Sequence, residues 1–199
     1  MKFGRLLGVG AAALFAPALL IALNSAAAQA QDLKWHRIFG LVEAGNVVGV
    51  GTANPPTSGA VTGAAPWVTT SGHADVDLKT GMAKFRVKGL VLAVGSAGAL
   101  TGLGIGTNSG VTMVKGTLVC NVSGNTGAIK DSVEDDTDAV ALSFQGDASF
   151  DGSLVNAVPT VCLTNPEDVA FLIRIVVPGD GFANLWIAAG GVLTVDGDD

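Results

Sequence analysis

Hydrophobic and polar residues alternate with a period of two in the stretch "ADVDLKTGMAKFRVKGL", residues 74–90, on both sides of Thr80-Gly81. Alternation around a short glycine-containing turn predicts a β-hairpin with one apolar face and one polar face. A slip of one residue would bury the charged row, so the pattern also restricts the register. With Thr80-Gly81 as a two-residue loop, the opposed polar pairs are Asp77–Lys84, Asp75–Arg86 and His73–Lys88. We interpret these charges as a solvent-exposed sheet face.

Short apolar or alternating segments follow one another along the rest of the chain. The predicted strands are residues 33–42, 67–78, 82–92, 111–120, 138–150, 169–177 and 184–195. The run "VAFLIRIVV", 169–177, is almost entirely apolar and therefore indicates a buried central strand. The strand at 138–150 is expected to bend at Gly146.

Glycine, proline and small polar residues mark the expected connections, which are residues 51–66, 94–110 and the acidic stretch 121–137. A short helical turn is expected at 165–169, because Asn165 can cap it with Pro166 at its first position. No segment shows a helical period over eleven or more residues, and strands do not alternate with helices. The sequence therefore predicts an all-β fold, an antiparallel β-sandwich of about seven to nine strands.

The first thirty residues have the pattern of an export signal helix. Lys2 and Arg5 precede a long apolar core, and Ala28-Gln29-Ala30 forms a small-x-small cleavage site. An uncleaved membrane anchor is the alternative, because the apolar core is long. The expected organisation is a signal peptide at 1–30 and a single domain at 31–199 that ends in a short acidic tail. This pattern is typical of bacterial proteins exported to the periplasm or cell exterior.

Charge limits the partners of the mature chain. Cleavage after residue 30 removes two of the 11 basic residues and none of the 17 acidic ones, which leaves nine against 17 and a net charge of −8. No basic residues cluster in the sequence, which argues against nucleic acid or an anionic membrane as a partner. The expected partner is a protein or a cell-surface component.

Two cysteines, Cys120 and Cys162, fall in the mature part. In an exported protein an isolated pair is expected to form one disulfide. A metal or redox pair is the alternative, but the two residues are far apart in sequence and form no CxxC motif.

The segment "KDSVEDDTD" is the best candidate for a metal site. Calcium takes six to eight hard oxygen ligands, and weak sites suit the high calcium concentration outside cells. The alternative is a solvated acidic loop, because blocks of like charge usually remain hydrated. The candidate calcium ligands are Asp131, Glu134, Asp135, Asp136 and Asp138. No other cofactor is expected.

The common catalytic patterns are missing from the sequence. Ser71, His73 and Asp75 lie close together, but along a strand they would form a row rather than a convergent triad. His36 is expected to pack beside Trp35 rather than bind a ligand. The glycine-rich "GLGIGTNSG" matches neither dinucleotide nor phosphate-loop spacing. A secreted hydrolase whose paired carboxylates meet only in space stays open as an alternative.

Residues 71–90, "SGHADVDLKTGMAKFRVKGL", resemble the hairpin of CHRD-type domains, which are secreted β-sandwich modules. The resemblance implies an Ig-like or CHRD-like sandwich and an exported setting. The histidine-containing segment typical of those domains has no counterpart here, because "VLAVGSAGALTGLGIG" contains no histidine. The sequence as a whole predicts an exported, non-catalytic structural or interaction module.

Overall fold

The computed structural model describes residues 31–43, 46–49, 61–62, 64–93, 105–124, 131–176 and 184–197. The expected signal segment, most of the expected loops 51–66 and 94–110, and the end of the acidic tail lie outside these ranges. The strands are β1 (Gln31–Gly40), β2 (Val47–Val48), β3 (Val61–Thr62), β4 (Trp67–Val68), β5 (Ser71–Asp77), β6 (Met82–Lys88), β7 (Val91–Leu92), β8 (Met113–Cys120), β9 (Val133–Asp136), β10 (Val140–Ala141), β11 (Ala148–Ser153), β12 (Val169–Ile175) and β13 (Trp186–Gly197). A short helix, α1 (Thr160–Thr164), lies between β11 and β12.

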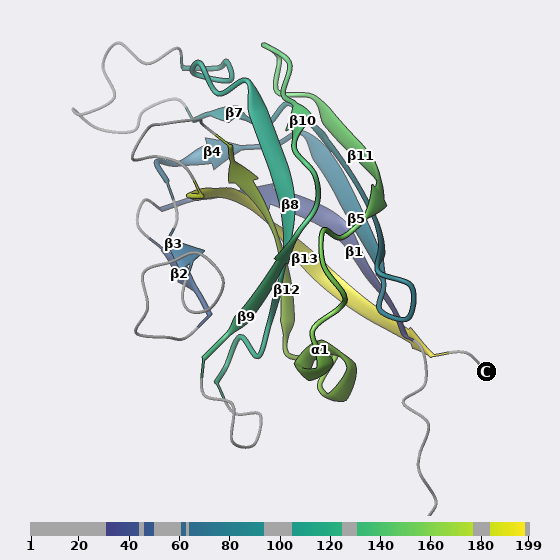
Figure 1. Ribbon diagram of the computed structural model, residues 1–199. Helices are drawn as coiled ribbons and strands as arrows, with labels where there is room; N and C mark the ends of the chain where they lie inside the picture. The colour runs from purple at the N-terminus through teal and green to yellow at the C-terminus, as the bar shows by residue number, and fades with distance from the viewer. Residues whose placement is uncertain are drawn as a thin grey trace, which may run out of the picture.

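In the described part of the chain, one nine-stranded antiparallel sheet dominates the structure. Its order is β10-β8-β12-β13-β1-β5-β6-β11, with β9 beside β8, while β2–β3 and β4–β7 form two small sheets. The sheet curls so far that its two ends, β10 and β11, come into contact (Figure 1). The strands therefore enclose a core as two facing layers, and the predicted all-β, sandwich-like antiparallel fold is confirmed.

Aromatic rings from both layers meet in the middle of the core. The ring centroids of Trp35 and Phe171 lie 5.5 Å apart, and Phe85 lies 5.9 Å from both Phe171 and Phe150. Ring pairs at this separation each add about 0.5–1.5 kcal/mol beyond their buried area. These four rings connect β1, β12, β6 and β11 across the interior.

Two strand glycines make room for these rings. A Cβ at Gly116 would lie 2.5 Å from Cζ of Phe171, and a Cβ at Gly190 would lie 2.5 Å from Cδ1 of Trp35. Real Cβ atoms do not approach so closely, so any larger residue would displace a ring from the centre of the core. Part of the high glycine content is thus a packing requirement of the aromatic core.

The central strand β12 is buried on both faces, as predicted. Phe171 and Ile173 belong to the main core, while Leu172 packs on the other face in a second, small core. The residues of the second core are Leu41, Val119, Leu172 and Trp186. A continuous apolar run is the pattern expected of a strand covered on both sides.

The hairpin β5–β6 forms as predicted, but its register differs by two residues. Val76 pairs with Ala83 and Asp75 pairs with Lys84, so the loop is longer than Thr80-Gly81 alone. The extra length comes from Asp77, whose carboxylate accepts hydrogen bonds from the backbone N–H groups of residues 79 and 80 and from the Thr80 hydroxyl. A shift of two keeps every side chain on its predicted face.

Two elements predicted from the sequence are wrong, and a third is partly right. The expected acidic loop 121–137 contains the strand β9, which pairs with β8. The expected single strand 138–150 is two strands, because the chain turns at residues 143–146 and Gly146 adopts φ +82°. The short helix lies at Thr160–Thr164, and Asn165 ends it. The expected segment forms a turn rather than a helix, in which the Asp168 N–H donates to the Asn165 carbonyl at 3.1 Å.

The turn geometry predicts that Asp77 stabilises the fold more than the other charges of its row. Burial alone would raise the pKa of Asp77, but the hydrogen bonds from Thr80 and the backbone outweigh it and hold the pKa below its ordinary value. We expect Asp77→Ala to lower the free energy of unfolding by about 1 kcal/mol at pH 7. The matched change Lys84→Ala, which removes an exposed ion pair with Asp151, should lower it by less than about 0.5 kcal/mol.

The effect of Asp77 should also depend on pH. Because the folded state holds this carboxyl proton less tightly than the unfolded chain, the stabilisation is present above the unfolded pKa of about 3.9 and is lost as the pH falls through the folded pKa. Urea denaturation at neutral and strongly acidic pH measures both effects. Equal losses for Asp77→Ala and Lys84→Ala at neutral pH would contradict the assigned turn.

Candidate functional site

A group of charged side chains lies on the outer face of β8, β9 and β12, the face opposite the main core. Arg174 donates to Glu134 Oε2 at 2.5 Å through Nη1 and to the carbonyl of Asn184 at 2.8 Å through Nε. Lys115 Nζ lies 2.6 Å from Asp136 Oδ2, and the Thr117 hydroxyl donates to Asp136 Oδ1. We call these five residues, Lys115, Thr117, Glu134, Asp136 and Arg174, the Arg174 cluster.

The register explains why the Arg174 cluster needs two carboxylates. Lys115 and Arg174 are direct partners across β8 and β12, so two cations face each other. Asp136 is the partner of Thr117 on the next strand, and it lies 2.6 Å from Lys115 and 3.8 Å from Arg174. With Glu134 the cluster carries two positive and two negative charges, which makes it neutral overall.

Burial makes the Arg174–Glu134 contact energetically important. The side chains of Arg174 and Glu134 are 2% and 4% exposed. Burial raises the pKa of Glu134 above its usual range, while the guanidinium of Arg174 opposes that rise. A buried pair of this kind contributes little net stability compared with apolar residues, but removing one partner leaves an uncompensated charge.

One feature of the sequence points to this cluster. Arg174 is the one charged residue inside the otherwise apolar run 169–177. A charge in a fully buried strand requires a partner. The nearby acid-rich segment was the obvious source of that partner, but strand pairing across forty residues had to be known first.

The acidic segment does not lie together as one calcium-binding set. Glu134 and Asp136 face the Arg174 cluster, while Asp135 points to the opposite side of β9. Asp131 and Asp138 are exposed near the two ends of the strand. Among the described residues, no group of three or more histidine, cysteine, aspartate or glutamate side chains is placed to hold a metal ion. The period of a strand separates these carboxylates, because neighbouring side chains point to opposite faces.

Asp135 instead connects β9 to the segment that leads into α1. Its Oδ1 atom accepts hydrogen bonds from the backbone N–H of Asn156 at 3.3 Å and from Asn156 Nδ2 at 3.0 Å. Its Oδ2 atom is buried and has no hydrogen-bond partner within the described ranges. Asp135 thus acts as an internal tie between two parts of the fold.

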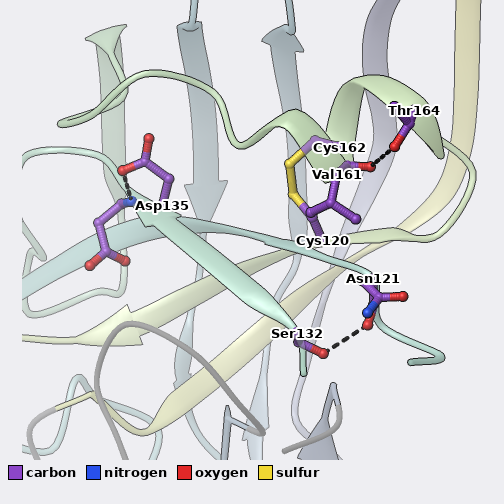
Figure 2. The surroundings of a disulfide bond; sticks show 8 residues. Cys120, Asn121, Ser132, Asp135, Val161, Cys162 and Thr164 are labelled. Atoms are coloured by element: carbon purple, nitrogen blue, oxygen red, sulfur yellow. Dashed lines mark hydrogen bonds between the residues drawn. A yellow bond between two sulfur atoms is a disulfide. The ribbon is translucent and has the colours of Figure 1, made fainter. Parts of the chain in front are cut away.

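The predicted disulfide joins Cys120, at the end of β8, to Cys162 in α1 (Figure 2). The two Cα atoms are 5.2 Å apart and both residues are fully buried. Figure 2 also shows Ser132 donating to the carbonyl of Asn121 beside the bridge. The disulfide therefore fixes the helix to the end of the sheet, which makes it a structural bond.

The outer face of β5 and β6 is polar and exposed, as predicted. The side chains of Lys84, Arg86 and Lys88 form a cationic row along β6. His73, opposite Arg86, is also exposed, and it lies in a row with Ser71 and Asp75 rather than converging with them. His36 is exposed rather than packed beside the buried Trp35, and its Nε2 shares a hydrogen bond with Thr194.

A hollow of about 350 Å³ opens beside this cationic row, between β6, β11 and β10. Its lining includes Arg86, Lys88, Val140, Ala141, Asp147 and Ser149. The hollow could not be predicted from the sequence, because it forms only when the sheet curls and its two ends, β10 and β11, approach each other.

Comparison of the chain with protein-family models finds no matching family. Comparison with curated proteins and with solved structures also finds no match. The resemblance of residues 71–90 to CHRD-type domains thus stays a prediction. In the described part of the chain, no helix is long and apolar enough to span a bilayer.

Reduction of the disulfide should destabilise the protein strongly. The bridge spans a sequence separation of 42, for which the loss of loop-closure entropy in the unfolded chain is about 4 kcal/mol. We expect reduction to lower the melting temperature on the order of 10 °C. Calorimetry of oxidised and reduced protein measures this difference, and Cys120→Ala with Cys162→Ala provides a thiol-free control. An unchanged melting temperature in both would show that the bridge is energetically irrelevant.

Substitutions in the Arg174 cluster should show that removing one partner of the Arg174–Glu134 pair costs more stability than removing both. Arg174→Met leaves Glu134 buried without a counter-charge, so we expect a loss of about 3–5 kcal/mol in the free energy of unfolding. Arg174→Met combined with Glu134→Leu should recover much of that loss, because no buried charge is left alone. Urea denaturation of both single variants and the double variant tests this. Additive losses would show that the two side chains are not coupled.

Proposed function

We propose that this protein is an exported, non-catalytic interaction module of the periplasm or cell surface. The observation that supports this most directly is the exposed cationic row of β6 beside a hollow, on a chain whose mature net charge is −8. Two cations of this row, Arg86 and Lys88, form no ion pair within the described residues, whereas Lys84 pairs with Asp151. Exposed cations without acidic partners on a protein of net negative charge are a common property of recognition surfaces.

Two further features support export and an interaction role. The signal-like pattern of residues 1–30 and the Cys120–Cys162 bridge both suit an oxidising compartment. The bridge, the aromatic core and the Arg174 cluster hold the strands in place, so binding at a surface on these strands orders side chains but little backbone. The hairpin resemblance to CHRD-type modules fits the same role.

A secreted hydrolase is the second candidate, and one observation favours it. Glu134 and Asp136 form a carboxylate pair on the same face of β9, and burial raises the pKa of Glu134 as in a general acid. Both carboxylates, however, are held by internal partners, and the Glu134 side chain is only 4% exposed. A general acid must reach the substrate, so this geometry favours a structural role for the pair.

An experiment on the exported protein distinguishes the interaction module from the hydrolase. We expect the full chain, expressed with a C-terminal tag, to yield an exported form that lacks residues 1–30 and has no free thiol. This form should bind saturably to isolated cell envelopes, and it should not turn over glycoside, ester or peptide substrates. Heat-denatured protein serves as the control for nonspecific adsorption. Turnover that is lost in Glu134→Gln or Asp136→Asn, without loss of folding, would favour the hydrolase instead.

A further inference from the structure

The hollow between β6, β11 and β10 exists because the curled sheet does not close there. Thr137, before β10, and Leu154, after β11, form an isolated antiparallel bridge. At the other end of these two strands, the Ser143 N–H donates to the Asp147 carbonyl at 3.0 Å. Between these two points β10 and β11 lie next to each other but belong to opposite ends of the sheet order. The hollow is thus framed at both ends by backbone contacts rather than being a chance gap between mobile side chains.

The lining of the hollow carries more positive than negative charge, because Arg86 and Lys88 face a single acidic residue, Asp147. Arg86 and Lys88 line the hollow from the same face of β6, about 7 Å apart along the strand. Neither has an acidic partner within the described ranges, whereas Lys84 on the same strand pairs with Asp151 at 3.1 Å. The acidic residue in the lining, Asp147, accepts a hydrogen bond from the Gly89 N–H at 3.0 Å.

The neighbours of Arg86 suit an anion that also carries hydroxyl groups. Ser149 is the register partner of Arg86 on β11, and His73 is its partner on β5, so a serine and a histidine lie beside Arg86 on the same outer face of the sheet. Val140 and Ala141 supply a small apolar wall on the opposite side. A guanidinium binds carboxylate or phosphate through two parallel hydrogen bonds, whereas an ammonium acts as a point charge.

We propose that this hollow binds an anionic saccharide of one or two rings, with its carboxylate or phosphate held by Arg86. Lys88 and the Ser149 hydroxyl bind a second charged or hydroxyl group of the same ligand, and the ring packs on Val140 and Ala141. The volume of about 350 Å³ is within the range of small-molecule sites. This inference rests on the proposed exported interaction role, because acidic glycans are components of cell envelopes and their surroundings.

Titration calorimetry of the oxidised mature protein with three probes tests the proposal. Digalacturonate carries carboxylates, glucose 6-phosphate carries a phosphate, and maltose is the neutral control. We expect saturable binding of one or both anionic sugars with a Kd below about 10 mM and no binding of maltose in that range. The relative affinity of the first two probes distinguishes a uronate ligand from a phosphorylated one.

Variants locate the binding. Arg86→Gln should weaken the anionic probe about tenfold or more, and Arg86→Lys should weaken it several-fold because a lysine cannot form the bidentate contact. The matched control Lys79→Gln removes an exposed lysine from the nearby turn and should leave the affinity unchanged. Equal weakening in Lys79→Gln and Arg86→Gln, binding of maltose as tight as that of the anions, or no binding of any probe would overturn the proposal.

The sugar titrations and the envelope assay together separate this inference from the proposed function. If none of the sugars binds but the unmodified protein still binds envelopes saturably, the anion site is overturned and the interaction role stands. If the unmodified protein does not bind envelopes, the interaction role is overturned, independently of the result of the sugar titrations.

Discussion

The packing of aromatic rings against strand glycines is the constraint on which the rest of this structure depends. Phe171 lies between Trp35 and Phe85, and it can do so because Gly116 and Gly190 carry no Cβ beneath the rings. Protein interiors are packed at crystal-like density, so the rings and the glycines determine how closely the two layers approach. At this separation of the layers the curled sheet has its two end strands, β10 and β11, in contact.

The outer face of β8, β9 and β12 depends on the compensation of a buried charge. Arg174 is buried on this face, so its charge must be compensated. Glu134 and Asp136 provide that compensation and attach β9 to the sheet, while Asp135 attaches the same strand to the segment before α1. The acidic segment is therefore used mainly as internal structure, and its charges are distributed over two faces of one strand.

The surface around Arg86 and Lys88 differs from the Arg174 cluster because these two cations have no acidic partners within the described residues. Arg86 and Lys88 project from a strand held on both sides by neighbouring strands, so their backbone positions are fixed before any ligand arrives. Binding at this surface therefore has to order side chains but no backbone. Arg174 has the same guanidinium group as Arg86, but it is buried and paired with Glu134. Burial rather than residue type therefore decides which charges can contact a ligand.

The sequence by itself determined the period-two pattern, and with it the all-β class, the buried central strand at 169–177, the two faces of the hairpin at 74–90 and the pairing of its two cysteines. These features depend on local periodicity or on composition, which can be read along the chain. Strand pairing, the hairpin register, the strand within residues 121–137, the fate of the five carboxylates and the hollow at Arg86 were decided by the tertiary structure. Each depends on contacts between residues far apart in sequence, and a local pattern cannot specify which distant strand becomes a neighbour.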